Sequence, residues 1–356
     1  MPERQLATVE TIVEIHPIPD ADAIEVAKIR GWNVVVRKDE FAVGDQVVYF
    51  EIDSALPLAD PRFTFLGERS TKTIPADPQT GAPARDVHVL KTARLRGTYS
   101  QGLVISADAF AAEIAAVSKK ADADLDADLA GEIGVTKWEP PLPDGMAALA
   151  PFPSFLRKTD AERVQNIDAA TWEKIQADAQ AWSPVEKVDG SSLTAWLDED
   201  RVLHVAGRNW ELDPGHDNAH WRAAAAAGLA QLLEPGQYVQ AEVAGTGIQS
   251  NPLKLDGVRL FVFTLGRLDG TALGALTPHD QWPAWARDLA APVYDFPLPS
   301  TIEETVSQVE KLTSLISPGK GAEGVVWTRR DGQGLAGLEG RHVFKSISAR
   351  YLLKHS

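Results

Sequence analysis

The sequence predicts an α+β protein with two domains: a small N-terminal β-barrel and a larger domain in which antiparallel strands alternate with helices. A chain of 356 residues is long enough to bury two separate cores. Short runs of β-branched and aromatic residues fill residues 1–105, and a proline-rich segment interrupts the chain near residue 140. These observations together favour two domains of different architecture.

The front part of the chain is expected to form the barrel. Its short apolar runs are separated by residues typical of turns, such as Lys38–Glu40. Five or so short strands with few helices suit a barrel of OB type, a fold that often binds oligonucleotides. Strands are expected at Gly31–Arg37, Gln46–Glu51, Val87–Leu90, Ala93–Gly97 and Gly102–Ile105.

Three side chains of this barrel are candidates for contacts with RNA. Arg94 and Arg96 would bind phosphates, and the ring of Tyr99 would stack on a base. Taken singly, each residue is better explained as part of a solvated barrel edge.

The domain boundary is expected in the extended, proline-rich segment from Trp138 to Pro153, after a helix at residues 108–118. We therefore assign residues 1–140 to the barrel domain with its linker and residues 141–356 to the second domain.

The second domain is expected to mix strands and helices. Helices are predicted at residues 169–181 and 217–233, where the run Ala223–Ala227 has high helix propensity. Antiparallel strands between irregularly placed helices indicate an α+β domain. Strands are expected at Leu193–Leu197, Leu203–Ala206, Tyr238–Val243, Leu260–Leu265, Gly324–Thr328 and His342–Ile347.

The composition is that of an ordinary globular protein, with 44% hydrophobic and 24% charged residues. No apolar run is long enough to span a membrane, and the N-terminus lacks the features of a signal peptide. The absence of cysteine excludes disulfides, a thiolate nucleophile and a cysteine zinc site. We therefore expect a cytoplasmic protein.

The charge is strongly acidic but uneven. A net charge of −15 argues against a protein that coats nucleic acid without specificity. From Lys320 to the end, however, seven basic side chains face three acidic ones. Such a local basic region is able to bind phosphates.

The segment Val185–Ser192 carries the strongest chemical signal. It places Lys187 two residues before Asp189, followed by Gly190 and two serines. A lysine attacks phosphorus only as the neutral amine, whereas its ordinary pKa is near ~10.4. A divalent cation held by carboxylates would disfavour the ammonium and screen a triphosphate. Gly190 would allow a tight turn beneath a nucleotide. A K-x-D-G match alone is weak evidence, because many surface turns contain it.

The motifs that follow make the signal specific, because their order and spacing resemble the nucleotidyltransferase motifs of covalent lysyl-AMP ligases. The closest resemblance is to ATP-dependent RNA ligases with an N-terminal OB domain, of the Deinococcus and Naegleria type. It covers nearly the whole chain. The matching pieces are Leu95–Gly102, Lys158–Asp160, Arg163–Asn166, Val185–Ser192, Arg208–Asn209, Gln240–Gly245, Gly247–Asn251, Phe261–Phe263, Glu323–Val326 and Phe344–Lys354.

The resemblance implies catalytic roles for five residues. Lys187 would carry AMP, and Asp189 and Glu323 would hold Mg²⁺ or Mn²⁺. Glu242 would lie in the nucleotide pocket near the ribose, and Lys345 would bind phosphate. For both glutamates, a salt-bridged position at a strand end is the structural alternative.

Further residues are implied in nucleotide binding. Phe263, or alternatively Phe261, would stack on adenine, although a strand phenylalanine is more often simply buried. Arg208 and Arg163 would contact phosphate or the 3′-OH end, where a planar guanidinium binds two oxygens. Asn209 would position the ribose or the strand end. Besides these, the predicted nucleotide-binding set contains Glu186, Lys187, Gly190, Glu242 and Lys345.

The sequence departs from the family at one motif. The usual K-x-K has two lysines, whereas the positions two residues from Lys345 are Val343 and Ile347. Arg341 or Lys354 would have to supply the second positive charge.

The function implied is that of an ATP-dependent RNA ligase. It would join 3′-OH and 5′-phosphate RNA ends, at nicks in duplexes, through a lysyl-AMP intermediate and an RNA-adenylate. The expected substrates are ATP and RNA or an RNA-containing nicked duplex, and the expected state is a monomer. The alternatives are a non-catalytic OB-fold RNA-binding protein with a nucleotide-sensing second domain, or a related DNA ligase or GTP-using capping enzyme.

Two further patterns are set aside. Gly332–Gly337 matches G-x-G-x-x-G but lies between two expected strands, which predicts a hairpin loop. His216 and His220 stand at i and i+4 without the glutamate of H-E-x-x-H, which predicts a surface helix.

Overall fold

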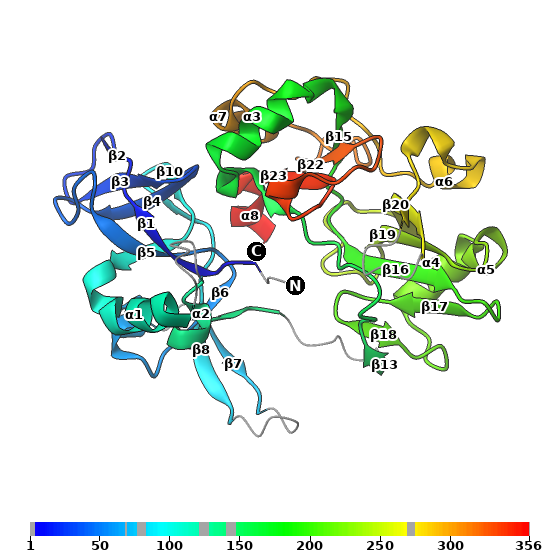
Figure 1. Cartoon of the computed structure of the whole chain (residues 1–356), viewed down its shortest axis with the longest axis horizontal. Helices are drawn as coiled ribbons and strands as arrows, with labels where there is room; N and C mark the ends of the chain where they lie inside the picture. The colour runs from blue at the N-terminus through cyan, green and yellow to red at the C-terminus, as the bar shows by residue number, and fades with distance from the viewer. Residues whose placement is uncertain are drawn as a thin grey trace. The chain divides into compact units, whose positions relative to one another are not determined.

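A computed structural model describes residues 4–67, 70–76, 83–120, 128–139, 147–268 and 275–355 (Figure 1). The chain divides into two compact units: Met1–Pro140 together with Leu352–Lys354, and Pro141–Tyr351 together with His355. Of the expected proline-rich junction, residues 140–146 lie outside the described residues. Both units combine strands with helices, which confirms the predicted α+β class.

The first unit consists mainly of short antiparallel strands in small sheets. The strand orders are β1-β5-β11, β2-β3-β4 and β12-β6-β8-β7, and β9 pairs with β10 as a hairpin. The strands are β1 (Ala7–Thr11), β2 (Glu14–Pro17), β3 (Ile24–Ile29), β4 (Trp32–Arg37), β5 (Gln46–Phe50), β6 (Ser54–Pro57), β7 (Thr71–Ile74), β8 (Arg85–Val89), β9 (Ala93–Leu95), β10 (Thr98–Ser100), β11 (Leu103–Ser106) and β12 (Thr136–Lys137).

Aromatic side chains form the centre of this unit. The Phe50 ring meets the Phe63 ring edge-on, with centroids 5.4 Å apart, and Phe110 packs beside both. Phe110 ends a short 3-10 helix, and α1 (Ala111–Lys120) and α2 (Ala130–Ile133) follow it. The five expected strands correspond to β4, β5, β8, β9 and β11, whereas no strand was predicted at β1, β2, β3, β6, β7, β10 or β12.

The second unit contains two sheets. The larger has seven strands in the order β13-β18-β17-β16-β19-β20-β21, and the smaller has four in the order β14-β23-β22-β15. The strands are β13 (Ala148–Pro151), β14 (Glu162–Arg163), β15 (Trp182–Glu186), β16 (Ser191–Leu197), β17 (Leu203–Ala206), β18 (Trp210–Leu212), β19 (Gln237–Gly245), β20 (Val258–Arg267), β21 (Ala275–Leu276), β22 (Gly324–Arg329) and β23 (Val343–Ile347).

Helices cover both sheets. Residues of α4 and α6 pack on one face of the seven-stranded sheet, and α7 packs beside β23 with α3 nearby (Figure 1). Asn218 caps α4, Asp168 caps α3, and Thr301 with Glu304 forms a capping box on α7. The helices are α3 (Ala169–Ala177), α4 (Ala219–Ala226), α5 (Leu229–Leu232), α6 (Ala284–Asp288), α7 (Ile302–Val309) and α8 (Ala349–His355).

The two faces of the seven-stranded sheet differ in character. Leu193, Val243 and Val262 point into the core beneath the helices. Because side chains alternate along a strand, Ser192 and Glu242 lie on the opposite face, where they are paired in register. We call the end of this face that carries Ser192 and Glu242 the polar face; farther along the same strands, Trp196 and Tyr238 are buried in an apolar cluster.

A β-bulge interrupts the pairing of β19 with β20. Gln240 pairs with Thr264 and Ala241 pairs with Val262, so that Phe263 lies between the two pairs without a partner. Phe263 is half-buried, whereas Phe261 is buried.

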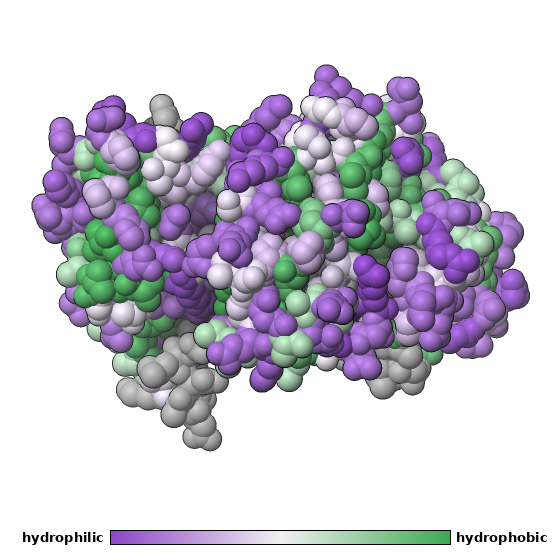
Figure 2. Space-filling view, turned by 90° about the horizontal axis from the view of Figure 1, so that it is seen from above, coloured by the Kyte–Doolittle hydropathy of each residue, from purple (hydrophilic) through white to green (hydrophobic). Residues whose placement is uncertain are grey.

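The outer surface is largely polar. Hydrophilic residues cover most of the face shown in Figure 2, and apolar residues occupy smaller areas of it. Within the described ranges, no helix is long and apolar enough to cross a membrane.

Candidate active site

Lys187 lies in the turn that joins the two sheets of the second unit. β15 of the smaller sheet ends at Glu186, and β16 of the larger sheet begins at Ser191. The Lys187 amide donates to the Gly324 carbonyl at 3.0 Å, and its Nζ lies 2.7 Å from Glu323 Oε1. The predicted nucleophile and one predicted metal ligand are thus in direct contact.

Three carboxylates determine the charge of Lys187. Burial alone would lower the pKa of Lys187, but attraction to Glu323, Glu242 and Asp189 outweighs this and raises the pKa above its usual value. Without nucleotide and metal, the side chain is therefore a firmly held ammonium ion.

Burial and mutual repulsion also shift the pKa values of the carboxyl groups. Burial raises the pKa of Glu242 to about 8, with further increase from the charges of Glu323 and Asp189, whereas Lys187 and Arg208 oppose the change. Burial also raises the pKa of Glu323 above its usual value, against the attraction of Lys187. Both carboxyl groups are therefore protonated more readily in this site than they would be in water.

These residues fit a divalent cation that arrives with a nucleotide. Glu323 Oε2 is buried and has no hydrogen-bond partner among the described residues. No group of three or more His, Asp or Glu side chains in the same part of the chain is arranged to hold a metal ion by itself. Mg²⁺ is commonly bound by one or two carboxylates together with substrate phosphates. Asp189 and Glu323 suit that mode of binding.

Asp189 has a partner that the sequence did not indicate. The hydroxyl of Tyr351, in α8, donates to Asp189 Oδ2 at 2.7 Å. Tyr351 belongs to the C-terminal segment that resembles the family, but no local pattern connects it with a residue 162 positions earlier. Only the tertiary structure brings them together.

Gly190 is required by close packing, not by a left-handed backbone. A Cβ atom at this position would lie 2.2 Å from the Val243 carbonyl oxygen of β19. The Gly190 carbonyl in turn accepts a hydrogen bond from the Gln249 side-chain amide. The turn that carries Lys187 is therefore pressed directly against the larger sheet.

The carboxylate of Glu186 is bound by the protein itself. It accepts hydrogen bonds from the Ser314 hydroxyl and from the amides of Leu315 and Ile316, at 2.8 Å for Leu315. Burial raises the pKa of Glu186, although these bonds oppose the change. This predicted nucleotide-binding residue thus anchors the strand before Lys187 to residues 314–316.

Both candidate aromatic residues lie on β20. Phe261 is buried at 4% exposure, pairs in register with Glu242, and has the Arg259 guanidinium 5.1 Å from its ring centroid. Phe263 is less enclosed and occupies the bulge. Both rings therefore lie on the strand next to Glu242, and Phe263 is the more accessible of the two.

Arg208 and Asn209 form the tight turn between β17 and β18. Arg208 makes an exposed ion pair with Asp160 at 2.7 Å, and Asn209 Oδ1 accepts from Lys158 Nζ at 2.8 Å. The intervening Thr159 hydroxyl lies 3.0 Å from Ser192 Oγ, on the polar face of the larger sheet. The segment Lys158–Asp160 thus joins the Arg208–Asn209 turn to the site.

Arg163 and Lys345 are neighbours on paired strands. They are in register across the parallel pair β14 and β23, and Arg163 is only 5% exposed. Ile347, at the position of the missing lysine, is buried and pairs with Gly324. The two basic side chains therefore stand side by side where the family has K-x-K.

The prediction of a surface position for His220 is wrong. His220 is 1% exposed, and its Nε2 lies 3.1 Å from Ser191 Oγ and 3.2 Å from the Ser192 carbonyl. Burial lowers the pKa of His220 to about 4, which keeps it neutral behind β16. The glycine pattern at Gly332–Gly337 lies in the hairpin between β22 and β23, as predicted.

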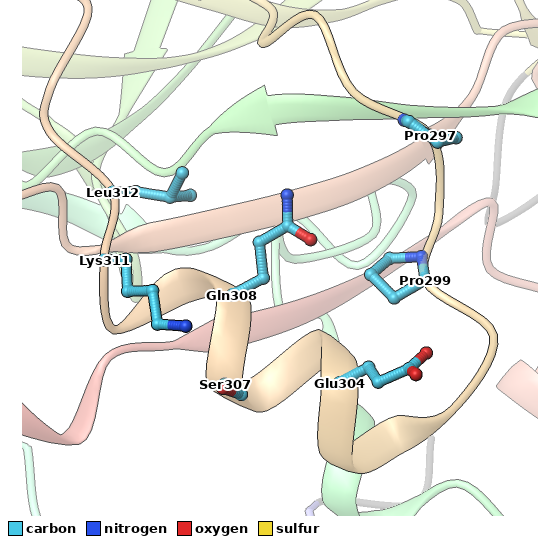
Figure 3. Close-up of a pocket in the computed structure, with 7 residues that line it drawn as sticks. All are labelled: Pro297, Pro299, Glu304, Ser307, Gln308, Lys311 and Leu312. Atoms are coloured by element: carbon cyan, nitrogen blue, oxygen red, sulfur yellow. The ribbon is translucent and has the colours of Figure 1, made fainter.

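A cavity of about 530 Å³ occurs elsewhere in the second unit (Figure 3). Side chains of α7 and of residues on either side of it in the chain line this cavity. None of the predicted site residues is among them, so the cavity is separate from the candidate site. The lining residues are Pro297, Pro299, Glu304, Ser307, Gln308, Lys311 and Leu312.

Comparison with known proteins agrees with this geometry. The RNA ligase family model matches residues 181–347, and an OB-fold domain model matches residues 6–107. No curated protein matches the chain.

Solved structures of Naegleria gruberi RNA ligase are similar along the whole chain. A ligand-free aspartate-to-alanine mutant is 32% identical with a TM-score of 0.80, covering 100% of this chain and 99% of that one. A lysine-to-alanine mutant with ATP and Mn has 32% identity and a TM-score of 0.80, and a lysine-to-methionine mutant with AMP and Mn has 33% and 0.79. Each of the two covers 99% of both chains. The two-domain OB and ligase architecture is thereby confirmed, and the chain belongs to the RNA ligase family that includes the Naegleria gruberi enzyme.

Proposed function

We propose that this RNA ligase uses ATP to join a 3′-OH end to a 5′-phosphate end at nicks in RNA-containing duplexes, with Lys187 as the covalent carrier of AMP. The observation that carries the proposal is the contact between Lys187 Nζ and Glu323, within the electrostatic reach of Glu242 and Asp189. All these groups belong to one unit of one chain, which is consistent with a monomeric enzyme.

In the first step the Lys187 amine attacks the α-phosphorus of ATP. A nitrogen–phosphorus bond forms, the bond from the α-phosphorus to the bridging oxygen breaks, and pyrophosphate leaves. Lys187 must lose its proton first. A divalent cation on Asp189 and Glu323 would supply positive charge that disfavours the ammonium and screens the triphosphate.

The surrounding residues would bind and orient the nucleotide. Phe263 would stack on adenine, because its bulged position leaves the ring more accessible than Phe261. Because its pKa is raised, Glu242 would be protonated and would donate a hydrogen bond to the ribose. Lys345 and the adjacent Arg163 would bind phosphate oxygens, so that Arg163, in place of Arg341 or Lys354, supplies the charge that Ile347 cannot.

In the later steps AMP passes to the RNA 5′-phosphate, and Lys187 regains a free amine. The 3′-OH then attacks that phosphorus, a phosphodiester forms and AMP leaves. Arg208 and Asn209 would hold the strand ends, since their turn contacts the segment that reaches Ser192.

The first domain, residues 1–140, would bind the RNA duplex, and residues 141–356 would perform the chemistry. The β9–β10 hairpin supports this division, because the Arg94 guanidinium lies 5.5 Å from the Tyr99 ring centroid with Arg96 exposed beside it. A cationic, aromatic hairpin suits phosphate and base contacts.

Labelling with ATP tests the proposal. Mixing the protein with α-labelled ATP and Mn²⁺ should give an acid-labile covalent adenylate, whereas GTP should give little. Lys187→Ala should abolish the label and Lys187→Arg should not restore it. Equal labelling of Lys187→Ala would refute the assignment. Nicked duplexes that differ only in the sugar on each side would then show whether RNA is required at the 3′-OH end.

A further inference from the structure

Two arginine side chains meet at the border of the candidate site. Arg157 precedes β14, and Arg341 lies just before β23 in the hairpin that follows β22. Arg157 Nη2 donates to the Glu339 carbonyl at 3.0 Å, and Arg341 Nη1 donates to the Lys158 carbonyl at 3.1 Å. Main-chain oxygens thus hold each guanidinium against the segment that carries the other.

Neither guanidinium is neutralised by a carboxylate. Among the described residues neither Arg157 nor Arg341 forms an ion pair. Burial and the charge of Arg341 lower the pKa of Arg157, and only Glu339 opposes this. Arg157 Nε is moreover buried without an acceptor in this part of the structure. Two such cations side by side are costly unless an anion binds to them.

The pair is connected to the polar face of the larger sheet. The Arg157 carbonyl accepts a hydrogen bond of 2.7 Å from Gln240 Nε2, and Gln240 stands two residues before Glu242 on the same face of β19. The neighbouring Lys158 contacts Asn209. The main chain of Arg157 and the side chain of Lys158 therefore border the polar face.

The arginines are nevertheless displaced from the reacting phosphorus. On β23, Ile347 pairs with Gly324, whose carbonyl binds the Lys187 amide. Arg341 lies six positions before Ile347, which at ~3.3 Å for each residue is roughly 20 Å along the strand direction. The phosphates of an ATP held at Lys187 do not extend that far, whereas the backbone of a nucleic acid strand does.

We propose that Arg157 and Arg341 form a binding site for a backbone phosphate of the RNA strand, a few nucleotides from the end that is joined. This inference rests on the proposed function. Two guanidiniums present planar forks of donors that match phosphate oxygens. In a chain with a net charge of −15, a local pair of this kind compensates for the general repulsion of RNA.

Salt-dependent binding of RNA tests the site. The variants are Arg157→Gln, Arg341→Gln, the double variant and Arg341→Lys. Arg222→Gln is the matched control, because it removes an equal charge from an exposed ion pair on α4. Affinity for a nicked duplex with RNA on the 3′-OH side is measured by fluorescence anisotropy without ATP, at several salt concentrations.

We expect the double variant to bind about tenfold more weakly and to lose about one from the slope of log affinity against log salt. Arg341→Lys should keep the slope but lose affinity, because the charge remains and the fork is lost. In all of these variants the adenylation of Lys187 should stay within about twofold of the unmodified protein. The control Arg222→Gln should bind RNA with the same affinity and salt slope as the unmodified protein.

An unchanged salt slope in the double variant would overturn the site, as would a loss of Lys187 adenylation equal to the loss of binding. If Arg341→Gln does not fold, the slope of Arg157→Gln decides the matter. Failure of the unmodified protein to form an adenylate would contradict the proposed function alone, because the binding assay contains no ATP.

Discussion

The Tyr351 hydroxyl donates a 2.7 Å hydrogen bond to Asp189 Oδ2, and so connects α8 to the turn that carries Lys187. Burial and the neighbouring Asp189 charge raise the pKa of Tyr351, which keeps the hydroxyl protonated as a donor. With one carboxylate oxygen occupied, the other is free to turn toward a metal ion. Tyr351 is therefore a positioning residue for Asp189.

Tyr351→Phe should raise the Mn²⁺ concentration needed for half-maximal adenylation by about tenfold, because groups that orient metal ligands typically have effects of this size. A metal titration of the labelling rate measures this. Tyr294→Phe is the control, since it removes a similarly buried hydroxyl that donates to Thr313. An unchanged half-saturation in Tyr351→Phe would show that the hydrogen bond does not orient Asp189.

Glu186→Gln should destabilise the protein by about 2–3 kcal/mol, because the amide would present a donor where the carboxylate accepts from Ser314 and two main-chain amides. Thermal unfolding should show a fall of roughly 5–10 °C in Tm. Glu173→Gln, at an exposed position on α3, should leave the Tm unchanged. If the two variants melt alike, the Glu186 carboxylate does not anchor the strand.

Gly190→Ala should push the Lys187 turn away from β19, since the new methyl group would lie 2.2 Å from the Val243 carbonyl oxygen. Overpacking of this kind costs about 1–3 kcal/mol, and we expect adenylation to fall at least tenfold. A methyl group at Gly207 would have its nearest neighbouring atoms 4.0 Å away, so Gly207→Ala should be tolerated. Normal labelling by Gly190→Ala would exclude the close packing as a requirement.

Glu242→Gln should stabilise the ligand-free protein, increasingly so at higher pH. The pKa of Glu242 is about 8 in the folded protein, whereas a glutamate in an unfolded chain has a pKa of ~4.3. The folded state binds the proton more tightly, so stability from this residue is present below pH ~4 and is lost as the pH rises through 8. Glutamine does not ionise and avoids this loss.

The measurement is the difference in Tm between Glu242→Gln and the unmodified protein from pH 5 to pH 9. We expect the difference to grow by on the order of 10 °C across this range, since the two pKa values give about 4 kcal/mol between pH 5 and pH 9 and each kcal/mol corresponds to roughly 2–4 °C. A constant difference would show that Glu242 is already ionised in the folded protein at pH 5.

The sequence predicted the parts of this protein that short patterns encode. Lys187, Asp189 and Glu323 belong to ordered motifs, and the tertiary structure brings them together in the second unit. The α+β class and five barrel strands followed from composition and turn residues. β3 was missed because adjacent Val26 and Ala27 break its alternation, and β1 because its alternating run is only five residues long and has few strongly apolar side chains.

The remaining features depend on contacts between distant segments. Tyr351 reaches Asp189, Ser314 reaches Glu186, and His220 is buried behind Ser191. No local spacing encodes these pairs, because each is set by the packing of a helix or loop against a strand. For the same reason, the missing lysine at Ile347 was noticed in the sequence, whereas the adjacent Arg163 became evident only from the register of β14 and β23.

The bulge at Phe263 means that β20 changes phase within the site. Before it, even-numbered residues such as Leu260 and Val262 enter the helix-covered core; after it, the odd-numbered Leu265 does so. Deleting Phe263, as opposed to replacing it, would remove the bulge and restore strict alternation, but Leu265 would stay in the core, because Thr264 and Leu265 already pair in register with Gln240 and Val239. The bulge therefore adds the Phe263 ring to the strand without changing which side chains the rest of β20 directs into the core.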